Sequence, residues 1–211
     1  MENNLIKLIS ISSPAVCNKL PEINEALLQM VGTQGIDLIE LLKYKNGFYA
    51  FESALHVFAS GCANTTTDLL EWNRHDLWKK EYEGRIGDVF FFAEDVFGSQ
   101  FALSHEKVER FDPETGEFEE FAISLEEWAE RILSDYSYET GYQIASDWQA
   151  IHGPLLKGQR LLPKTPFVLG GAYEIENLYA GNALDGMKFR ASIWQQIRSL
   201  PDGTPIKLKV V

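Results

Sequence analysis

The sequence predicts an α+β fold: N-terminal helices, then a central antiparallel β-sheet with helices packed on it, then a C-terminal strand-helix-strand unit. Three observations predict this fold. Residues 21–47 have helical spacing, residues 88–122 contain short apolar runs separated by turn signals, and residues 124–133 return to helical spacing. The order of helices, meandering strands and a further helix is typical of an α+β protein.

The first third of the chain is predicted to be mainly helical. Pro21 precedes EINEALLQMV, as expected for a helix with proline in its first turn. The run GIDLIELLKYKNG places its apolar residues on one broad face and ends at Asn46-Gly47. The short apolar run in AFESALHVFAS predicts a strand, and TTDLLEWNRHDLWKKEY returns to helical spacing.

The middle third predicts the sheet. We expect strands at Val89–Ala93, Gln100–Leu103, Val108–Phe111 and Phe118–Ala122, with helices on one face of the sheet. Between the last two strands, DPETG combines a proline that sets a turn with a glycine that supplies a left-handed residue, which predicts a hairpin.

A capping box begins the helix after the sheet. Ser124 caps this helix and Glu127 reaches back to the chain before it. The apolar residues that follow have the i, i+3, i+4, i+7 spacing of one buried helix face.

The last 76 residues form a second part in this interpretation. We expect a module at 1–135 and a C-terminal extension at 136–211 that packs on it. In the extension, a long Gly- and Pro-rich connection that is ordered leads to a strand in AYEIENLYAG. A helix in ALDGMKFRASIWQQIRSL follows, and then a strand in IKLKVV.

Negative charge is concentrated in one region. The net charge is -12, and residues 81–139 hold 17 acidic and 4 basic residues, whereas residues 140–211 hold 5 acidic and 8 basic ones. A surface of one sign disfavours direct binding of nucleic acid and favours a basic partner. A surface that only keeps the protein in solution is the alternative interpretation.

The adjacent pair Glu94-Asp95 interrupts an apolar run, FFAEDVFGSQFAL, and has three interpretations: a catalytic acid pair, a metal site, or a turn. Consecutive strand residues point to opposite faces, so the two carboxylates cannot serve one site while the backbone is extended. We therefore expect a turn or bulge before Gly98, with no metal and no nearby histidine. The sequence has no HExxH, Cys/His cluster, phosphate loop or nucleophile elbow, and we expect no catalytic, metal or cofactor site and no enzyme.

Cys17 and Cys62 are the only cysteines, and we expect them to be reduced. The N-terminal segment MENNLIKLISISSPAVC lacks the basic start and cleavage pattern of a signal peptide. No apolar run approaches the roughly 18 residues of a membrane helix. These features predict a cytoplasmic protein that does not associate with membranes.

Three stretches of the chain resemble a known family. NGFYAF, FFAEDVFGSQFAL and FDPETGEFEEFAISLEEW, in this order, are similar to the SUKH superfamily, which includes the fungal Smi/Knr cell-wall regulators and bacterial immunity proteins of polymorphic toxin systems. The similarity covers residues 20–135, with the remainder as a longer form of the family.

The resemblance implies a non-enzymatic protein-binding protein. The first function that the resemblance implies is that of an immunity protein, which neutralises a cognate toxin, for example a nuclease. The acidic region favours this function because toxins that attack nucleic acid are basic. The alternative is an adaptor or regulatory scaffold of the Smi/Knr type. Loop side chains reach partners most readily, so the residues expected to bind the partner are Glu94, Asp95, Asp112 and Glu114.

Overall fold

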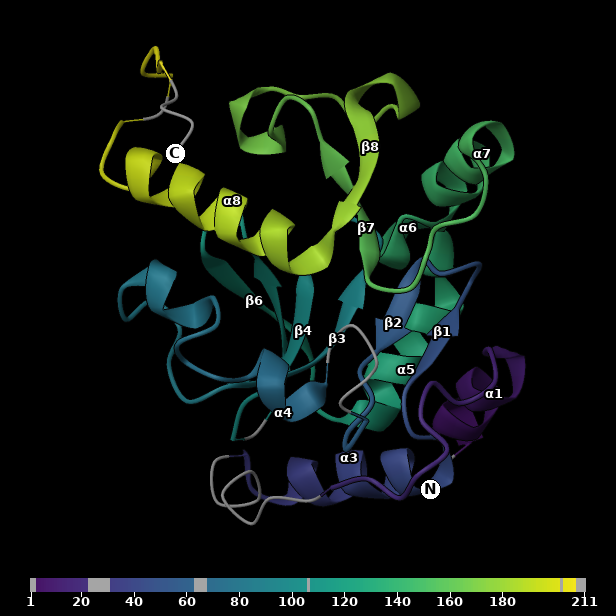
Figure 1. Ribbon diagram of the computed structural model, residues 1–211. Helices are drawn as coiled ribbons and strands as arrows, with labels where there is room; N and C mark the ends of the chain where they lie inside the picture. The colour runs from purple at the N-terminus through teal and green to yellow at the C-terminus, as the bar shows by residue number, and fades with distance from the viewer. Residues whose placement is uncertain (1–2, 23–30, 63–67, 106, 202, 208–211) are drawn as a thin grey trace.

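The computed structural model describes residues 3–22, 31–62, 68–105, 107–201 and 203–207 (Figure 1). The predicted α+β class is confirmed. Six antiparallel strands form one sheet in chain order, and a two-stranded antiparallel pair forms a second, smaller sheet. The strands of the large sheet are β1 (Phe48–Ala50), β2 (Leu55–Val57), β3 (Phe90–Asp95), β4 (Gln100–Leu103), β5 (Val108–Asp112) and β6 (Glu117–Ala122).

Helices precede, interrupt and follow the sheet. The α-helices are α1 (Asn3–Ile11), α3 (Thr33–Tyr44), α4 (Leu69–Trp72), α5 (Leu125–Ser134), α6 (Tyr136–Thr140), α7 (Tyr142–His152) and α8 (Ala183–Ile197). Three short 3-10 helices, η1 (Lys79–Tyr82), η2 (Phe167–Leu169) and η3 (Ile175–Asn177), complete the described helical segments.

The N-terminal helices agree only in part with their prediction. The helix expected before Asn46-Gly47 is α3, whereas the helix expected after Pro21 falls on residues 23–30, outside the described residues. Helix α1 was not predicted. The helical pattern after residue 65 folds as two separate short segments, α4 and η1, because the chain turns between them.

The DPETG segment forms the predicted hairpin turn between β5 and β6. The Gly116 N–H donates a 2.8 Å hydrogen bond to the Asp112 carbonyl, and Gly116 has a φ of 67°. A Cβ atom at Gly116 would lie 2.5 Å from Nε1 of Trp194 in α8. Glycine is therefore required here both for the turn and for the close approach of α8.

Both faces of the sheet are covered, so the expectation of helices on one face is wrong. Phe91 lies 5.0 Å from Trp78, between α4 and η1, whereas Phe92 lies 5.1 Å from Trp128 in α5. Neighbouring strand residues point to opposite faces. Figure 1 shows α4 and α5 on opposite sides of the sheet, and every residue of β3 is buried.

The predicted capping box begins α5. The Glu127 N–H donates to Ser124 Oγ at 3.1 Å, and Glu127 Oε2 accepts from the Ile123 N–H at 3.0 Å. Local hydrogen bonds thus fix where this helix starts.

The C-terminal extension is a β-hairpin followed by a helix. Strand β8 (Leu178–Asn182) and helix α8 occupy the predicted strand and helix, but β8 pairs with β7 (Gln159–Pro163), which lies in the segment expected to be a connection. The expected last strand, 206–211, falls mainly outside the described residues. The Leu161 N–H donates to the Val96 carbonyl at 2.8 Å, which joins the hairpin to the end of β3. The division of the chain at residue 135 stays a prediction.

The two cysteines form a disulfide, which corrects the expectation of reduced thiols. Cys17 and Cys62 are 45 residues apart in sequence, and their Cα atoms lie 5.9 Å apart, within the range of about 4.4–6.8 Å usual for disulfides. The bond joins the segment after α1 to the loop after β2. Sequence spacing alone could not reveal this contact. None of the described helices is both long and apolar enough to span a membrane.

Candidate functional site

Glu94 and Asp95 are the last two residues of β3, and both are buried. The expected turn before Gly98 is present and starts at Asp95, whose carbonyl accepts from the Gly98 N–H at 3.1 Å. Glu94, by contrast, lies in the extended strand, and the register shift of β3 lies between Phe91 and Ala93. Because the two residues alternate in an extended strand, their side chains enter two different environments.

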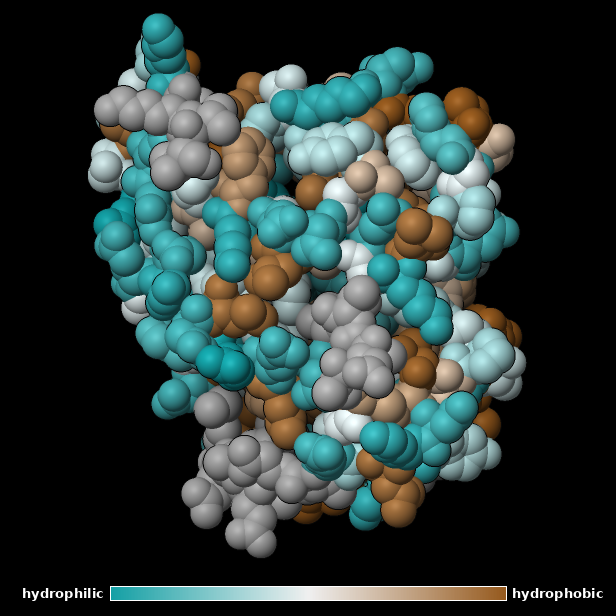
Figure 2. All heavy atoms as spheres, viewed as in Figure 1, coloured by the Kyte–Doolittle hydropathy of each residue, from teal (hydrophilic) through white to brown (hydrophobic). Residues whose placement is uncertain are grey.

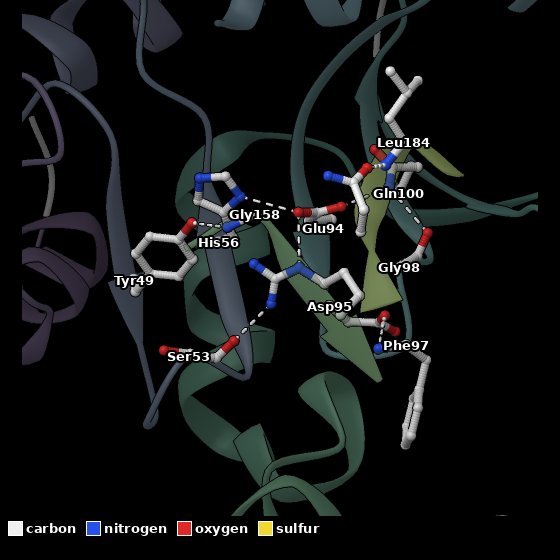
Figure 3. A network of polar contacts seen from close by, with 12 residues as sticks. Tyr49, Ser53, His56, Glu94, Asp95, Phe97, Gly98, Gln100, Gly158 and Leu184 are labelled. Atoms are coloured by element: carbon white, nitrogen blue, oxygen red, sulfur yellow. Dashed lines mark hydrogen bonds and ion pairs between the residues drawn. The ribbon is translucent and has the colours of Figure 1, made fainter. Parts of the chain in front are cut away.

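Glu94 lies at the centre of a buried polar network (Figure 3). Its Oε1 accepts a hydrogen bond from Arg160 Nε at 2.8 Å and lies 3.0 Å from His56 Nδ1, and its Oε2 accepts from Gln100 Nε2 at 3.2 Å. Glu94, His56 and Arg160 are each at most 3% exposed. The nearby histidine contradicts the expectation that none is present.

The network connects three parts of the chain. His56 comes from β2, Glu94 from β3, and Arg160 from β7 of the C-terminal hairpin. Arg160 Nη1 also donates to the Ser53 carbonyl at 2.8 Å. Trp72 Nε1 donates to Gln100 Oε1 at 2.8 Å. The carboxylate therefore has donors on both of its oxygens, as a buried charge requires.

Protonation follows from these contacts. Burial opposes ionisation of Glu94, but the Arg160 guanidinium and the hydrogen bond with His56 outweigh it and lower the pKa of Glu94 to about 2. Burial lowers the pKa of His56 despite the neighbouring carboxylate, so the imidazole is neutral at pH 7 and donates its Nδ1–H to Glu94. A charge that is enclosed and compensated in this way holds the fold together and is not accessible to a partner.

Asp95 lies at the edge of a cleft of about 900 Å³, called here the acidic cleft. The turn after β3, the β5–β6 hairpin, α6, the start of α7, η2, Tyr173 and Arg190 of α8 line it. The cleft thus lies between the large sheet and the C-terminal extension. Its carboxylates are Asp95, Asp112, Glu114, Glu117, Glu119, Asp135 and Glu139.

Two arginines offset only part of this charge. Arg110 Nη2 pairs with Glu139 at 2.5 Å and Arg110 Nη1 with Glu119 at 3.5 Å. Arg190 donates from Nη1 to the Phe97 carbonyl at 2.5 Å. The other five carboxylates of the cleft form no ion pair with a cation of the described chain, so negative charge is in excess when all are ionised.

Asp95 and Glu114 are the buried acids of this cleft. Asp95 Oδ1 accepts from the N–H groups of Phe97 and Ser99, each at 2.9 Å, but burial outweighs these bonds and the nearby Arg110 and raises the pKa of Asp95 to about 6. Burial likewise raises the pKa of Glu114. Ionised Asp95 and Glu114 are both less stable here than in water, and an added cation would stabilise them.

Three buried polar atoms of residues that line the cleft lack partners among the described residues: Arg110 Nε, Glu114 Oε1 and Arg190 Nη2. Glu114 is 3% exposed; its Oε2 accepts from the Val168 N–H at 2.7 Å, but its Oε1 has no hydrogen-bond partner among the described residues. Nη2 of Arg190, a residue that is also 3% exposed, likewise has no partner within the described chain.

Aromatic rings line the same cleft. Phe167 and Tyr173 stack with ring centroids 3.8 Å apart and an angle of 5° between their planes, and Phe97 meets both edge-on. Tyr173 is 58% exposed and Tyr138 is 78% exposed. Large exposed aromatic side chains beside unpaired charges are typical of binding surfaces.

The structure separates the four predicted partner-binding residues. Asp95, Asp112 and Glu114 line the acidic cleft, whereas Glu94 belongs to the buried network. The premise that all four lie in loops is wrong, since only Glu114 lies in a turn and the other three lie in strands. Glu94, Asp95 and Glu114 are buried, and Asp112 is half-buried. Their role in binding a partner stays a prediction.

Several residues of these two sites were not identified from the sequence, namely His56, Tyr138, Arg160, Tyr173 and Arg190. A signal for Arg160 was present: a carboxylate within an apolar strand requires a buried cation, and QRLLP offers an arginine beside apolar residues. Among the described residues there is no group of three or more His, Cys, Asp or Glu side chains arranged to hold a metal ion.

Comparison with known proteins adds a fold but no family. No family model matches the chain, and no curated protein matches it. A solved crystal structure, that of Atu4351 from Agrobacterium tumefaciens, is similar with a TM-score of 0.54 and 16% sequence identity, covering 90% of this chain and 88% of that one. At this identity the similarity is one of fold.

Proposed function

We propose that this chain is a non-catalytic protein-binding protein that captures a basic partner through the acidic cleft. The observation that carries the proposal is the concentration of seven carboxylates and only two guanidinium groups around one cleft, with exposed tyrosines beside them. Such a surface attracts a positively charged partner and repels nucleic acid.

Two features support a protein rather than a small molecule as the partner. The cleft is lined from both the large sheet and the C-terminal extension, and several of its acids, such as Glu117, Glu119 and Asp135, are exposed. On the face seen in Figure 2, hydrophilic side chains predominate and hydrophobic ones are scattered, so on this face an apolar patch is not the means of recognition.

The resemblance to the SUKH superfamily supports one form of this function, an immunity protein that neutralises a basic toxin such as a nuclease. In that form the carboxylates imitate the charge of a nucleic-acid backbone. An adaptor or scaffold is the alternative, and it differs in binding several partners with moderate affinity rather than one partner tightly.

The place where the protein acts is a second part of the proposal. The sequence favours the cytoplasm, whereas the Cys17–Cys62 disulfide favours a compartment in which disulfides persist. Alkylation of thiols in intact cells, followed by mass spectrometry, decides between them. Two alkylated cysteines support the cytoplasm, and an intact bond supports an oxidising compartment.

The test of the binding function uses proteins encoded beside this gene. Each is co-expressed with the chain, rescue of growth is scored, and the association rate of the purified pair is measured at several ionic strengths. The variant Asp112→Asn/Glu117→Gln/Glu119→Gln should associate at least about tenfold more slowly than wild type at low salt, because steering depends on the charge of the cleft.

A matched control removes three exposed acids elsewhere, Glu40→Gln/Glu71→Gln/Glu130→Gln, with the same change in net charge. Equal slowing of both variants would show that only net charge matters and would overturn the cleft as the binding site. Rescue of growth by one partner supports immunity, and binding of several partners without rescue supports the scaffold.

A further inference from the structure

We infer that the acidic cleft receives the side chain of an arginine on a segment of the partner protein, with Glu114 as its carboxylate acceptor and the Tyr173 ring beside it. This inference rests on the proposed function and narrows it from a basic partner to one type of side chain. It is carried by four features of the described residues.

The first feature is the unpartnered oxygen of Glu114. A buried acceptor without a donor is destabilising, and Oε2 of the same carboxylate already accepts a hydrogen bond from the Val168 N–H. Val168 belongs to η2, so the segment that carries Phe167 and Tyr173 also covers this carboxylate. A donor that enters beside these rings would supply the missing hydrogen bond.

The second feature is the excess of negative charge around that oxygen. Asp95, Asp112 and Glu117 line the cleft with Glu114 and form no ion pair with a cation of the described chain. The carboxylates Asp112 and Glu114 add to the effect of burial and raise the pKa of the Tyr173 hydroxyl to about 12. A cation, rather than an anion or a neutral group, is stabilised in this field.

The third feature is the flat aromatic surface. Tyr173 stacks on Phe167 and remains 58% exposed, and Tyr138 on α6 is 78% exposed. A planar guanidinium can stack on such a ring while its N–H groups bind a carboxylate, whereas an ammonium is a compact and strongly hydrated point charge. This geometry favours arginine over lysine.

The fourth feature is how the chain holds its own arginines. Arg110 lies over the rings of Phe101 and Phe121, at 5.1 and 4.6 Å, and pairs with Glu119 and Glu139. Arg160 lies 5.6 Å from the Tyr49 ring and pairs with Glu94. Arg131 and Arg198 show the same combination of an aromatic ring with a carboxylate around a guanidinium. In the cleft, Tyr173 and Glu114 offer a ring and a carboxylate that form no such combination with a guanidinium of the described chain.

The volume of the cleft favours a segment of a protein chain, rather than a free small molecule, as the ligand. At about 900 Å³ it lies near the upper end of the usual range for ligand sites, roughly 300–1,000 Å³. A guanidinium group fills only a small part of that space. The remaining cleft can take the neighbouring residues of an extended chain.

The test compares three probes on the full chain by isothermal titration calorimetry. The probes are the capped peptide acetyl-Gly-Arg-Gly-amide, the same peptide with lysine, and free agmatine. We expect the arginine peptide to bind at least about fivefold more tightly than the other two. If the arginine and lysine peptides bind with equal affinity, the inference that the cleft selects a guanidinium is wrong. If agmatine binds as tightly as the arginine peptide, the inference that the ligand is a protein segment is wrong.

Two variants locate the site. Glu114→Gln retains an oxygen for the Val168 N–H but removes the charge, and Tyr173→Leu removes an exposed ring; each should weaken the arginine peptide about tenfold. Glu130→Gln, an exposed acid of α5 outside the cleft, should change nothing. Near-ultraviolet circular dichroism checks that each variant is folded, and a folded Tyr173→Leu with unchanged affinity would contradict the inference.

Failure of this inference and failure of the proposed function give different results. In one outcome, the arginine and lysine peptides bind with equal affinity while the triple cleft variant still associates more slowly with the basic partner than wild type does. In that case the proposed function stands, and only the inference that the cleft receives an arginine fails. If the triple variant and its control associate equally fast, the cleft is not the binding site and both fail.

Discussion

The buried network around Glu94 and the acidic cleft beyond Asp95 begin at adjacent residues of β3, and they differ in how negative charge is compensated. Glu94 has Arg160, His56 and Gln100 as partners on its two oxygens, and its pKa is lowered to about 2. Asp95 accepts hydrogen bonds from the N–H groups of Phe97 and Ser99 but forms no ion pair with a cation of the described chain, and burial raises its pKa to about 6.

This difference distinguishes two kinds of carboxylate: those that stabilise the fold through ion pairs within the chain, and those that can pair with a cation of a partner. The buried Glu94 carboxylate with its guanidinium partner contributes to a specific arrangement of β2, β3 and β7. Asp95 and Glu114 are buried without a cation partner, so their ionisation reduces stability at neutral pH. Their place in one cleft is consistent with a partner that supplies the cation. The two adjacent acids thus enter two separate environments rather than one shared site.

The largest expected change in stability comes from substitutions in the buried network around Glu94. Glu94→Leu leaves Arg160 buried without its carboxylate, and we expect a loss of about 3–5 kcal/mol in the free energy of unfolding, measured by urea denaturation. Glu94→Leu/Arg160→Met should recover much of that loss because it removes both charges. A double variant as unstable as the single one would show that Arg160 is not left uncompensated in the single variant.

The disulfide gives the next effect. Its loss in Cys17→Ser/Cys62→Ser should lower the free energy of unfolding by about 2–4 kcal/mol, since the bond closes a long loop in the unfolded chain. Neither cysteine lines the acidic cleft, so the affinity for the arginine peptide should stay unchanged. A change in that affinity in the folded variant would mean that the disulfide also shapes the cleft.

Asp95→Asn should have a smaller effect that depends on pH. Because the pKa of Asp95 is about 6 in the folded chain and near 3.8 in the unfolded chain, the folded state binds more protons between these values. The contribution of Asp95 to stability is therefore largest below about pH 4 and is lost as the pH rises through 6.

Replacement by asparagine removes this dependence. Relative to wild type, Asp95→Asn should gain stability between pH 4 and pH 7, by at most about 3 kcal/mol. Urea denaturation of both proteins at several pH values measures the difference, in which the contributions of Glu94 and His56 cancel. A difference that does not vary with pH would contradict a raised pKa.

The smallest effect on stability is expected at the exposed acids of the cleft. Glu117→Gln and Glu119→Gln should each change the free energy of unfolding by less than about 0.5 kcal/mol, because exposed charges contribute little. Thermal denaturation measures this. A large loss would place Glu119 and its pairing with Arg110 among the contacts that hold the fold rather than among the available charges.

The sequence by itself determined the elements whose signals are local. The DPETG hairpin, the helix that begins at Ser124 and the strands β3 to β6 were predicted at nearly their observed positions. Turn glycines, capping side chains and strand alternation act between residues a few positions apart, so they are visible in the order of the letters.

Only the tertiary structure decided which distant residues meet. Arg160 is 66 residues from Glu94, Cys62 is 45 residues from Cys17, and η2 covers Glu114 from 54 residues away. Alternation along β3 shows that Glu94 and Asp95 face opposite ways, but not what each will meet there. That depends on how the C-terminal extension packs against the sheet, because burial and the nearest opposite charge come from segments brought together only by folding.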